Sequence, residues 1–176
     1  MAHWLFKQEP DCYSFDDLLR DSETVWDGIT NALALKHLRR CAAGDLAFYY
    51  HTGKEKAIVG IAGIIGPPTP DPNLGDDKLV VVSVKAVRAL AKPVSLATIK
   101  ADPLFAEWEL VRNSRLSVMP CPKALWNRVL ELAEENPAGR VESSEPAAPL
   151  SSRRRVPQTH SALRKPKEKP KTKKPR

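Results

Sequence analysis

Two short segments combine residue types that could hold a planar nucleobase. The first places Trp26 beside Asp27 and, four residues later, Asn31, and the second closes an apolar N-terminal stretch with Lys7 and Gln8. An aromatic face supplies stacking, and donors and acceptors read the edge of a base. The same residues also fit a purely structural interpretation, in which Trp26 belongs to the core and Asn31 caps a helix.

Five motifs occur along the chain in the order seen in EVE-domain proteins. They are WLFKQEP at residues 4–10, WDGITN at 26–31, DLAFYYHTG at 45–53, IVGIAGII at 58–65 and RLSVMP at 115–120. The chain therefore resembles this PUA-like family over about residues 2–135. The family is similar in fold to YTH domains, which hold a methylated base in an aromatic pocket. The resemblance implies a protein that reads a modified base in DNA or RNA, such as a methylated or hydroxymethylated cytosine.

The resemblance also implies which residues contact the base. They lie at the ends of strands and at the start of a helix, and they are Lys7, Gln8, Trp26, Asp27, Asn31, Tyr50, His51 and Thr52. Trp26 would stack on the base. Asp27, Asn31 and Gln8 would read its edge.

The chain departs from the usual family pattern close to these residues. Family members commonly have an arginine, a tyrosine and a glutamine where this chain has Thr30, Ala32 and Leu33. A tryptophan common in the family before the valine-rich strand is Leu79 here. These changes remove a phosphate contact and stacking surface, so they bear on the ligand more than on the fold.

Positive charge is concentrated at the C-terminal end of the chain. Residues 151–176 hold 11 lysines and arginines and one acidic residue, a local charge of +10. The first 150 residues hold 17 basic and 20 acidic side chains, or −3, so the net charge of +7 belongs to the tail. A cationic arm binds phosphates through counterion release. We therefore expect nucleic acid as the partner, with phosphate contacts from Arg153, Arg154, Arg155, Lys165, Lys173 and Lys174.

The elements that must position these residues follow from apolar periodicity and from turn and cap residues. Strands are predicted over residues 3–7, 46–51, 57–65, 79–84 and 115–119. Helices are predicted after Ser14 and over residues 32–40, 95–100 and 122–136, with a loop over 66–77. This pattern predicts an α+β fold, and the resemblance specifies a PUA-like mixed β pseudo-barrel flanked by short helices. We expect the domain to span residues 1–137, followed by a disordered Pro/Lys/Arg-rich tail over 138–176.

Two other functions are compatible with the sequence. One is a hydrolase or transferase in which Cys41 or Cys121 acts with His51, oriented by Asp27 or Asp45. The other is an interaction protein that acts mainly through its basic tail. The chain has neither a nucleophile-elbow motif nor a phosphate-binding glycine loop, which favours a protein that is not an enzyme and needs no cofactor.

The remaining composition favours a soluble protein without metal. None of the four histidines has a cysteine or histidine neighbour at ligand spacing, so no metal site is expected. The longest apolar stretches, around residues 57–65 and 79–84, are too short to span a membrane. Three cysteines without CxxC spacing, and no apparent secretory signal, predict a cytoplasmic protein with reduced thiols.

Overall fold

The structure is a computed structural model, and it describes residues 1–72, 78–134 and 155–156. Its strands are β1 (His3–Gln8), β2 (Glu23–Trp26), β3 (Leu46–His51), β4 (Ala57–Ile64), β5 (Thr69–Pro70), β6 (Val80–Ser95), β7 (Val118–Pro120) and β8 (Arg155–Val156). Its helices are α1 (Phe15–Asp21), α2 (Ala32–Leu38), α3 (Leu96–Ala101), α4 (Glu109–Arg112) and α5 (Lys123–Leu132), with a 3₁₀ turn, η1, at Pro103–Phe105.

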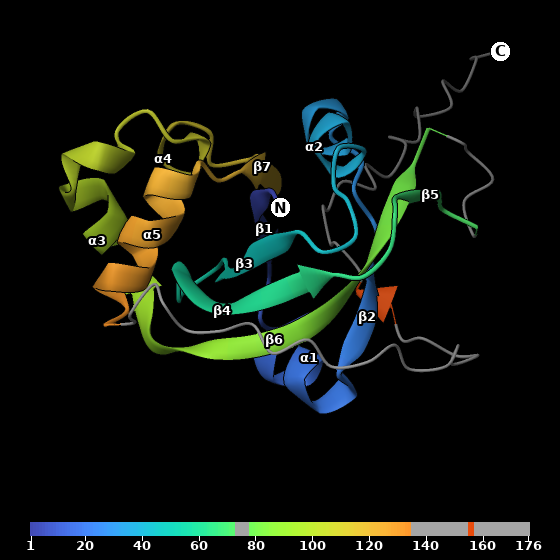
Figure 1. Ribbon diagram of the computed structural model, residues 1–176, viewed down its shortest axis with the longest axis horizontal. Coiled ribbons are helices and arrows are strands. Elements are labelled where there is room, and N and C mark those ends of the chain that lie inside the picture. The colour runs from blue at the N-terminus through green and yellow to red at the C-terminus, as the bar shows by residue number, and fades with distance from the viewer. Residues whose placement is uncertain (73–77, 135–154, 157–176) are drawn as a thin grey trace, which may run out of the picture.

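The strands form one mixed sheet in the order β7-β1-β3-β4-β6-β2-β8, with β5 paired to β6 (Figure 1). β1 runs parallel to β3 and β2 runs parallel to β8, whereas the other pairs are antiparallel. Three strands separate β1 from β2 in this order, yet the rings of Phe6 in β1 and Trp26 in β2 lie 5.0 Å apart. The sheet must therefore curl into a half-barrel, which confirms the predicted α+β, PUA-like architecture.

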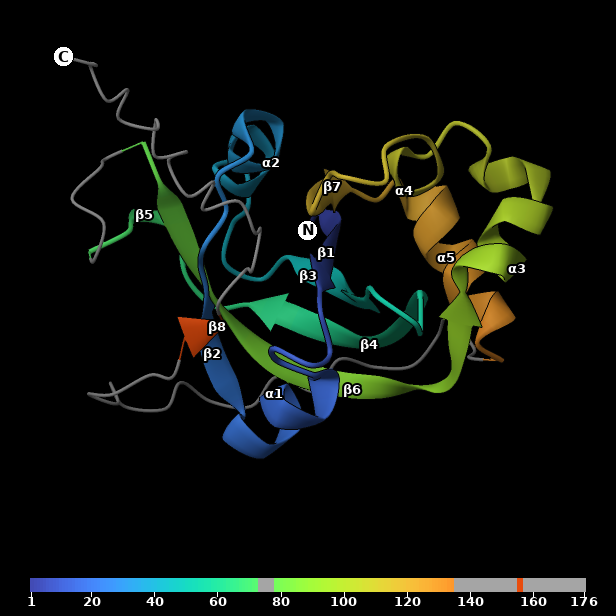
Figure 2. The same ribbon diagram turned by 180° about the vertical axis from the view of Figure 1, so that it is seen from behind.

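The helices divide between the two sides of the curled sheet. Helices α3, α4 and α5 gather at one end, and α1 lies on the opposite side of the sheet, as the two views show (Figures 1 and 2). Trp126 of α5 stacks on Phe48 of β3 with ring centroids 3.8 Å apart. On the side of α1, the Phe15 ring packs on Gly60, where an added Cβ would lie 2.3 Å from the ring. A glycine in β4 thus permits the close approach of α1.

Several predicted elements are confirmed at or near their predicted bounds. The strand over residues 46–51 is β3, and the helix after Ser14 is α1, whose capping box joins Ser14 and Asp17. The predicted strand over 79–84 is too short, because β6 continues to Ser95. Its second half carries exposed residues such as Arg88 and Lys92, and it lacks the apolar run by which its first half was predicted. The short strand β2 was not predicted either.

The C-terminal part of the chain contributes little to the described structure. The predicted disordered tail, residues 138–176, lies outside the described residues except for β8, whose backbone pairs with Val25 and Trp26 of β2. The predicted domain boundary at residue 137 also lies outside them. Among the described residues, no helix has the length and apolar character needed to cross a membrane.

Candidate functional site

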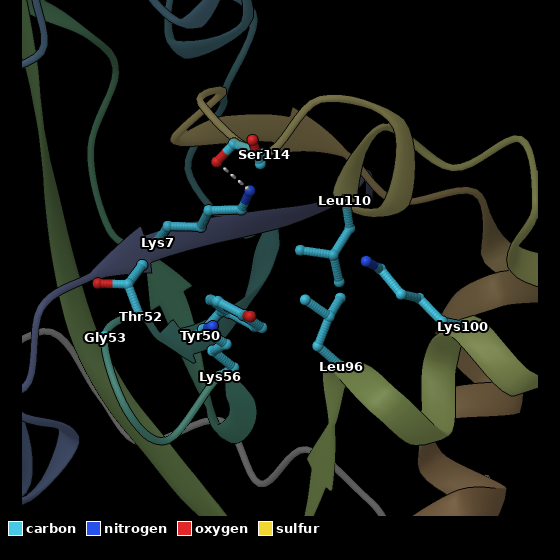
Figure 3. Close-up of a pocket in the computed structure, with 9 residues that line it drawn as sticks. All are labelled: Lys7, Tyr50, Thr52, Gly53, Lys56, Leu96, Lys100, Leu110 and Ser114. Carbon is cyan, nitrogen blue, oxygen red and sulfur yellow. Dashed lines mark hydrogen bonds between the residues drawn. The ribbon is translucent and has the colours of Figure 1, made fainter.

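A cleft of about 290 Å³ lies between the C-terminal ends of β1 and β3 and the helices α3 and α4 (Figure 3). It is lined by residues from the sheet, from the β3–β4 turn and from the helical end of the molecule: Lys7, Tyr50, Thr52, Gly53, Lys56, Leu96, Lys100, Leu110 and Ser114. Small-ligand pockets commonly measure roughly 300–1,000 Å³. The volume of the cleft therefore lies at the lower end of the range for small-ligand pockets.

Lys7 forms one wall of the cleft and is held there by backbone carbonyls. Its side-chain amine donates to the carbonyl oxygens of Ser114 at 3.2 Å and Asn113 at 3.5 Å. The residue is only 7% exposed, and this burial lowers the pKa of the amine to about 8. A lysine amine in such a place changes charge close to neutral pH.

Tyr50 and Thr52 bring an aromatic ring and a hydroxyl group to the same cleft. The Lys7 amine lies 5.8 Å from the centre of the Tyr50 ring. Burial raises the pKa of Tyr50 to about 12, so its hydroxyl stays protonated at neutral pH. The Thr52 hydroxyl oxygen is buried and has no hydrogen-bond partner within the described structure. Because such an atom costs about 1–3 kcal/mol, the Thr52 hydroxyl would gain from any hydrogen bond formed when neighbouring groups move to expose it.

The charge of the lining is entirely positive. Lys56, from the turn before β4, and Lys100, from α3, are exposed side chains that add two amines to that of Lys7. Among the described residues that line the cleft, none carries a carboxylate. Leu96 and Leu110 supply apolar surface on the helical side (Figure 3). This combination suits a ligand with a flat or apolar part and a negative charge nearby.

The structure divides the predicted base-binding residues between two environments. Lys7, Tyr50 and Thr52 line the cleft, with Lys7 7% and Tyr50 3% exposed, whereas Trp26 has no exposed surface and does not line it. Its indole packs against the rings of Phe6 and Tyr49, at 5.0 and 5.4 Å between centroids. Base stacking by Trp26 stays a prediction, and it would require these neighbouring rings to move.

Gln8 and Asp27 are also buried, at 3% and 6% exposure, and neither lines the cleft. Asn31 caps α2, because its side-chain oxygen accepts from the backbone N–H groups of Leu33 at 2.9 Å and Ala34 at 3.1 Å. This confirms the structural interpretation of Asn31, with its oxygen engaged at the helix start.

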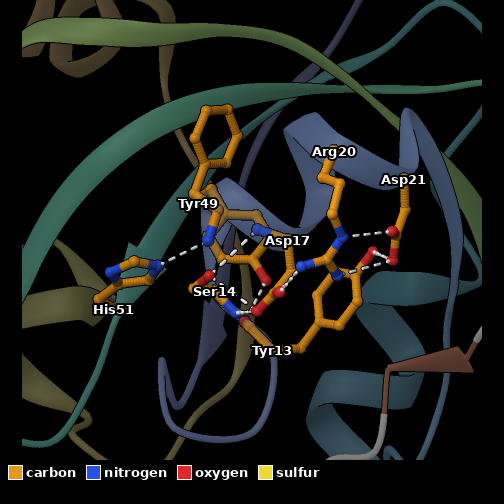
Figure 4. A network of polar contacts seen from close by, with 8 residues as sticks. Tyr13, Ser14, Asp17, Arg20, Asp21, Tyr49 and His51 are labelled. Carbon is orange, nitrogen blue, oxygen red and sulfur yellow. Dashed lines mark hydrogen bonds and ion pairs between the residues drawn. The ribbon is translucent and has the colours of Figure 1, made fainter.

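His51 joins β3 to α1 (Figure 4). One ring nitrogen accepts from the backbone N–H of Phe15 at 3.0 Å, and the other lies 2.6 Å from a Glu55 carboxylate oxygen. The neighbouring Tyr49 hydroxyl donates to the carbonyl of Tyr13 at 2.7 Å. Both side chains therefore position α1, with their polar atoms away from the cleft.

The residues proposed for thiol chemistry are likewise engaged elsewhere. Burial raises the pKa of the Cys41 and Cys121 thiols, which keeps both protonated at neutral pH. The Cys41 sulfur lies 3.7 Å from the His37 carbonyl oxygen, and the Asp45 carboxylate accepts from the Trp4 indole at 3.0 Å. With both ring nitrogens of His51 in other contacts, these residues form no assembled triad. Within the described ranges, no group of three or more potential ligands could hold a metal ion.

Most of the residues that line the cleft were not predicted from the sequence to bind a ligand. Lys56 lies in a hairpin turn, and Leu96 and Lys100 lie on a helix that was predicted without any role in binding. Leu110 belongs to α4, which was not predicted. Only the packing of α3 and α4 beside the end of β1 brings these residues together.

This chain is similar in sequence and in fold to several known proteins. The sequence model of the EVE domain family matches residues 2–132 of this chain. Thymocyte nuclear protein 1 of Homo sapiens is 30% identical over 172 residues, which cover 78% of this chain and 76% of that protein. The NMR structure of Rpa0253 from Rhodopseudomonas palustris is 40% identical, with a TM-score of 0.73 over 76% of this chain and 94% of that one.

Two further solved structures extend the comparison. The crystal structure of the human THYN1 protein in complex with DNA containing 5-methylcytosine is 28% identical to this chain. It aligns with a TM-score of 0.70 over 78% of this chain and 100% of that one. A mutant ZmASCH protein from Zymomonas mobilis aligns with a TM-score of 0.51 at 11% identity, over 75% of this chain and 99% of that one, and so shares the fold alone.

Proposed function

Because this chain belongs to the EVE-domain family, we propose that it binds nucleic acid and holds one modified base, such as a methylated cytosine, in the cleft beside Tyr50. The cleft carries the proposal, since it combines an aromatic ring, three amines and a hydroxyl oxygen that has no hydrogen-bond partner among the described residues. The relative crystallised with DNA containing 5-methylcytosine supports this class of ligand.

In this proposal, each group of lining residues contacts a different part of the bound nucleotide. The base stacks on the Tyr50 ring, which is 3% exposed in this structure and must be uncovered further, and stacking on an aromatic side chain contributes about 1–3 kcal/mol. Leu96 and Leu110 receive its methyl group, which adds about 1–3 kcal/mol in an apolar slot. Thr52 hydrogen-bonds the edge of the base, and Lys56 and Lys100 face the flanking phosphates. The base leaves its stack to enter, as in other proteins that read one nucleotide.

The proposal is one of binding without chemical turnover. The raised thiol pKa values and the engaged nitrogens of His51 support it. The basic tail, with Arg153, Arg154, Arg155, Lys165, Lys173 and Lys174, would add phosphate contacts. We also propose a cytoplasmic location, which fits the buried thiols of Cys41 and Cys121, neither of which forms a disulfide.

Replacing Thr52 by valine tests the role of the cleft. Valine keeps the shape but lacks the hydroxyl group, so the fold should be unchanged or slightly more stable. We expect about a tenfold loss of affinity for a fluorescent oligonucleotide with one 5-methylcytosine, measured by anisotropy. Thr69→Val, at an exposed threonine in β5, is the matched control and should leave the affinity unchanged. Equal binding by wild type and Thr52→Val would refute the assignment of the cleft.

A further inference from the structure

Lys7 is a largely buried lysine that lines the cleft. Its side chain comes from the end of β1, and the carbonyl oxygens of Asn113 and Ser114 fix the position of its nitrogen (Figure 3). The amines of Lys56 and Lys100 also line this cleft, and its helical side is apolar. Desolvation, which lowers the pKa of Lys7 here, is one of the features that make a lysine a nucleophile in proteins.

The amine must be neutral to act as a nucleophile. With a pKa of about 8, set by burial, roughly a quarter of Lys7 is neutral at pH 7.5, against about one molecule in a thousand for an ordinary lysine. A neutral amine retains two N–H bonds and can still donate to the carbonyl oxygens of Asn113 and Ser114. Addition to a ligand uses its lone pair.

We propose that Lys7 forms a reversible imine with an aldehyde-bearing ligand that enters the cleft. The nitrogen lone pair adds to the aldehyde carbon, and one N–H proton moves to the former carbonyl oxygen. The resulting carbinolamine then loses that oxygen as water, together with the second N–H proton. A C=N bond replaces the C=O bond, and no oxidant or reductant is consumed. The hydroxyl groups of Tyr50 and Thr52 line the same cleft and can relay the proton.

The rest of the lining selects the aldehyde. Tyr50 offers a ring for a planar ligand, and Lys56 and Lys100 offer charge for an anionic group. A planar aldehyde that carries a phosphate matches both features. An oxidised, formyl-bearing base within nucleic acid has the same chemistry, so the inference extends the proposed function of this cleft, and its first test needs no nucleic acid.

The test uses pyridoxal 5′-phosphate as a planar, phosphorylated aldehyde, added to the full-length protein. Imine formation is followed by its visible absorption, trapped with borohydride and located by peptide mass spectrometry. We expect Lys7 to be labelled at least about tenfold faster than Lys54, an exposed lysine outside the cleft. Labelling of Lys7 should be half-maximal near pH 8. Lys7→Arg should remove the fast phase, and Lys54→Arg should keep it.

The peptide map of the wild type decides the matter even if Lys7→Arg does not fold. Labelling of Lys7 no faster than that of Lys54 would overturn the inference. If binding to methylated oligonucleotides persists in that case, only the imine fails and the proposed function stands. If Lys7 is labelled rapidly while no oligonucleotide binds, the proposed function fails and the reactive amine remains.

Discussion

At the scale of single residues, the buried amine of Lys7 makes the stability of the protein depend on pH. Its folded pKa of about 8 lies below the ordinary value of 10.5, so the unfolded chain binds more protons between these values. The resulting destabilisation is fully present below pH 8 and is lost as the pH rises toward 10.5. Stability due to this group therefore increases with pH across that window.

Lys7→Met should remove this dependence. We expect the free energy of unfolding of the wild type, relative to Lys7→Met, to rise by about 2 kcal/mol between pH 7.5 and 9.5. Urea denaturation at several pH values measures it. Lys54→Met, at an exposed position, should show no such difference. A flat difference for Lys7→Met would mean that this amine is as well solvated as one on the surface.

Sequence reasoning identified part of the site but not which residues share an environment. Lys7, Tyr50 and Thr52 line the cleft because they lie at the predicted ends of β1 and β3. His51, between two of them, is turned toward α1 instead. Side chains alternate along a strand, but the sequence alone does not say which side faces the cleft and which faces a helix.

At the scale of secondary structure, the contact between β4 and α1 depends on Gly60, which has no Cβ atom. Gly60→Ala would place a Cβ 2.3 Å from the Phe15 ring, so the ring or the helix must shift. We expect a loss of about 3 kcal/mol in unfolding free energy from this overpacking. Thermal or urea denaturation measures the loss. Gly66→Ala has open space around its Cβ and should change stability by less than about 0.5 kcal/mol. Equal stabilities of the two variants would contradict the packing of α1 on β4.

Elements with local signals were predictable, whereas those defined by pairing were not. The caps of α1 and α3 are visible as Ser14 and Ser95 in the sequence, and both accept backbone hydrogen bonds. The strand β2 has only four residues, and two of them are Glu23 and Thr24, so it lacks an apolar pattern. Its antiparallel pairing with β6 is what holds it in the sheet. Long-range pairing of this kind leaves little trace in a short segment.

At the scale of the whole molecule, the tail and the cleft should contribute separately to binding. Glutamine can replace the six residues of the tail that are predicted to contact phosphates, which keeps the chain length and removes charge. These residues are Arg153, Arg154, Arg155, Lys165, Lys173 and Lys174. The slope of log affinity against log salt should become shallower by about 4–5. Anisotropy titrations from low to moderate salt measure it. Affinity should fall equally for methylated and plain oligonucleotides, since the cleft is unchanged. An unaltered salt slope would exclude the tail from phosphate binding.

In the proposed complex a single base lies against Tyr50, and photo-crosslinking tests this contact most directly. An oligonucleotide with 5-iodocytosine carries iodine where 5-methylcytosine carries its methyl group, and irradiation joins that position to an adjacent aromatic ring. Peptide mass spectrometry then locates the bond. We predict the crosslink on the peptide that contains Tyr50, and its loss when excess 5-methylcytosine oligonucleotide competes. Crosslinks confined to Trp26 or to the basic tail would contradict the account.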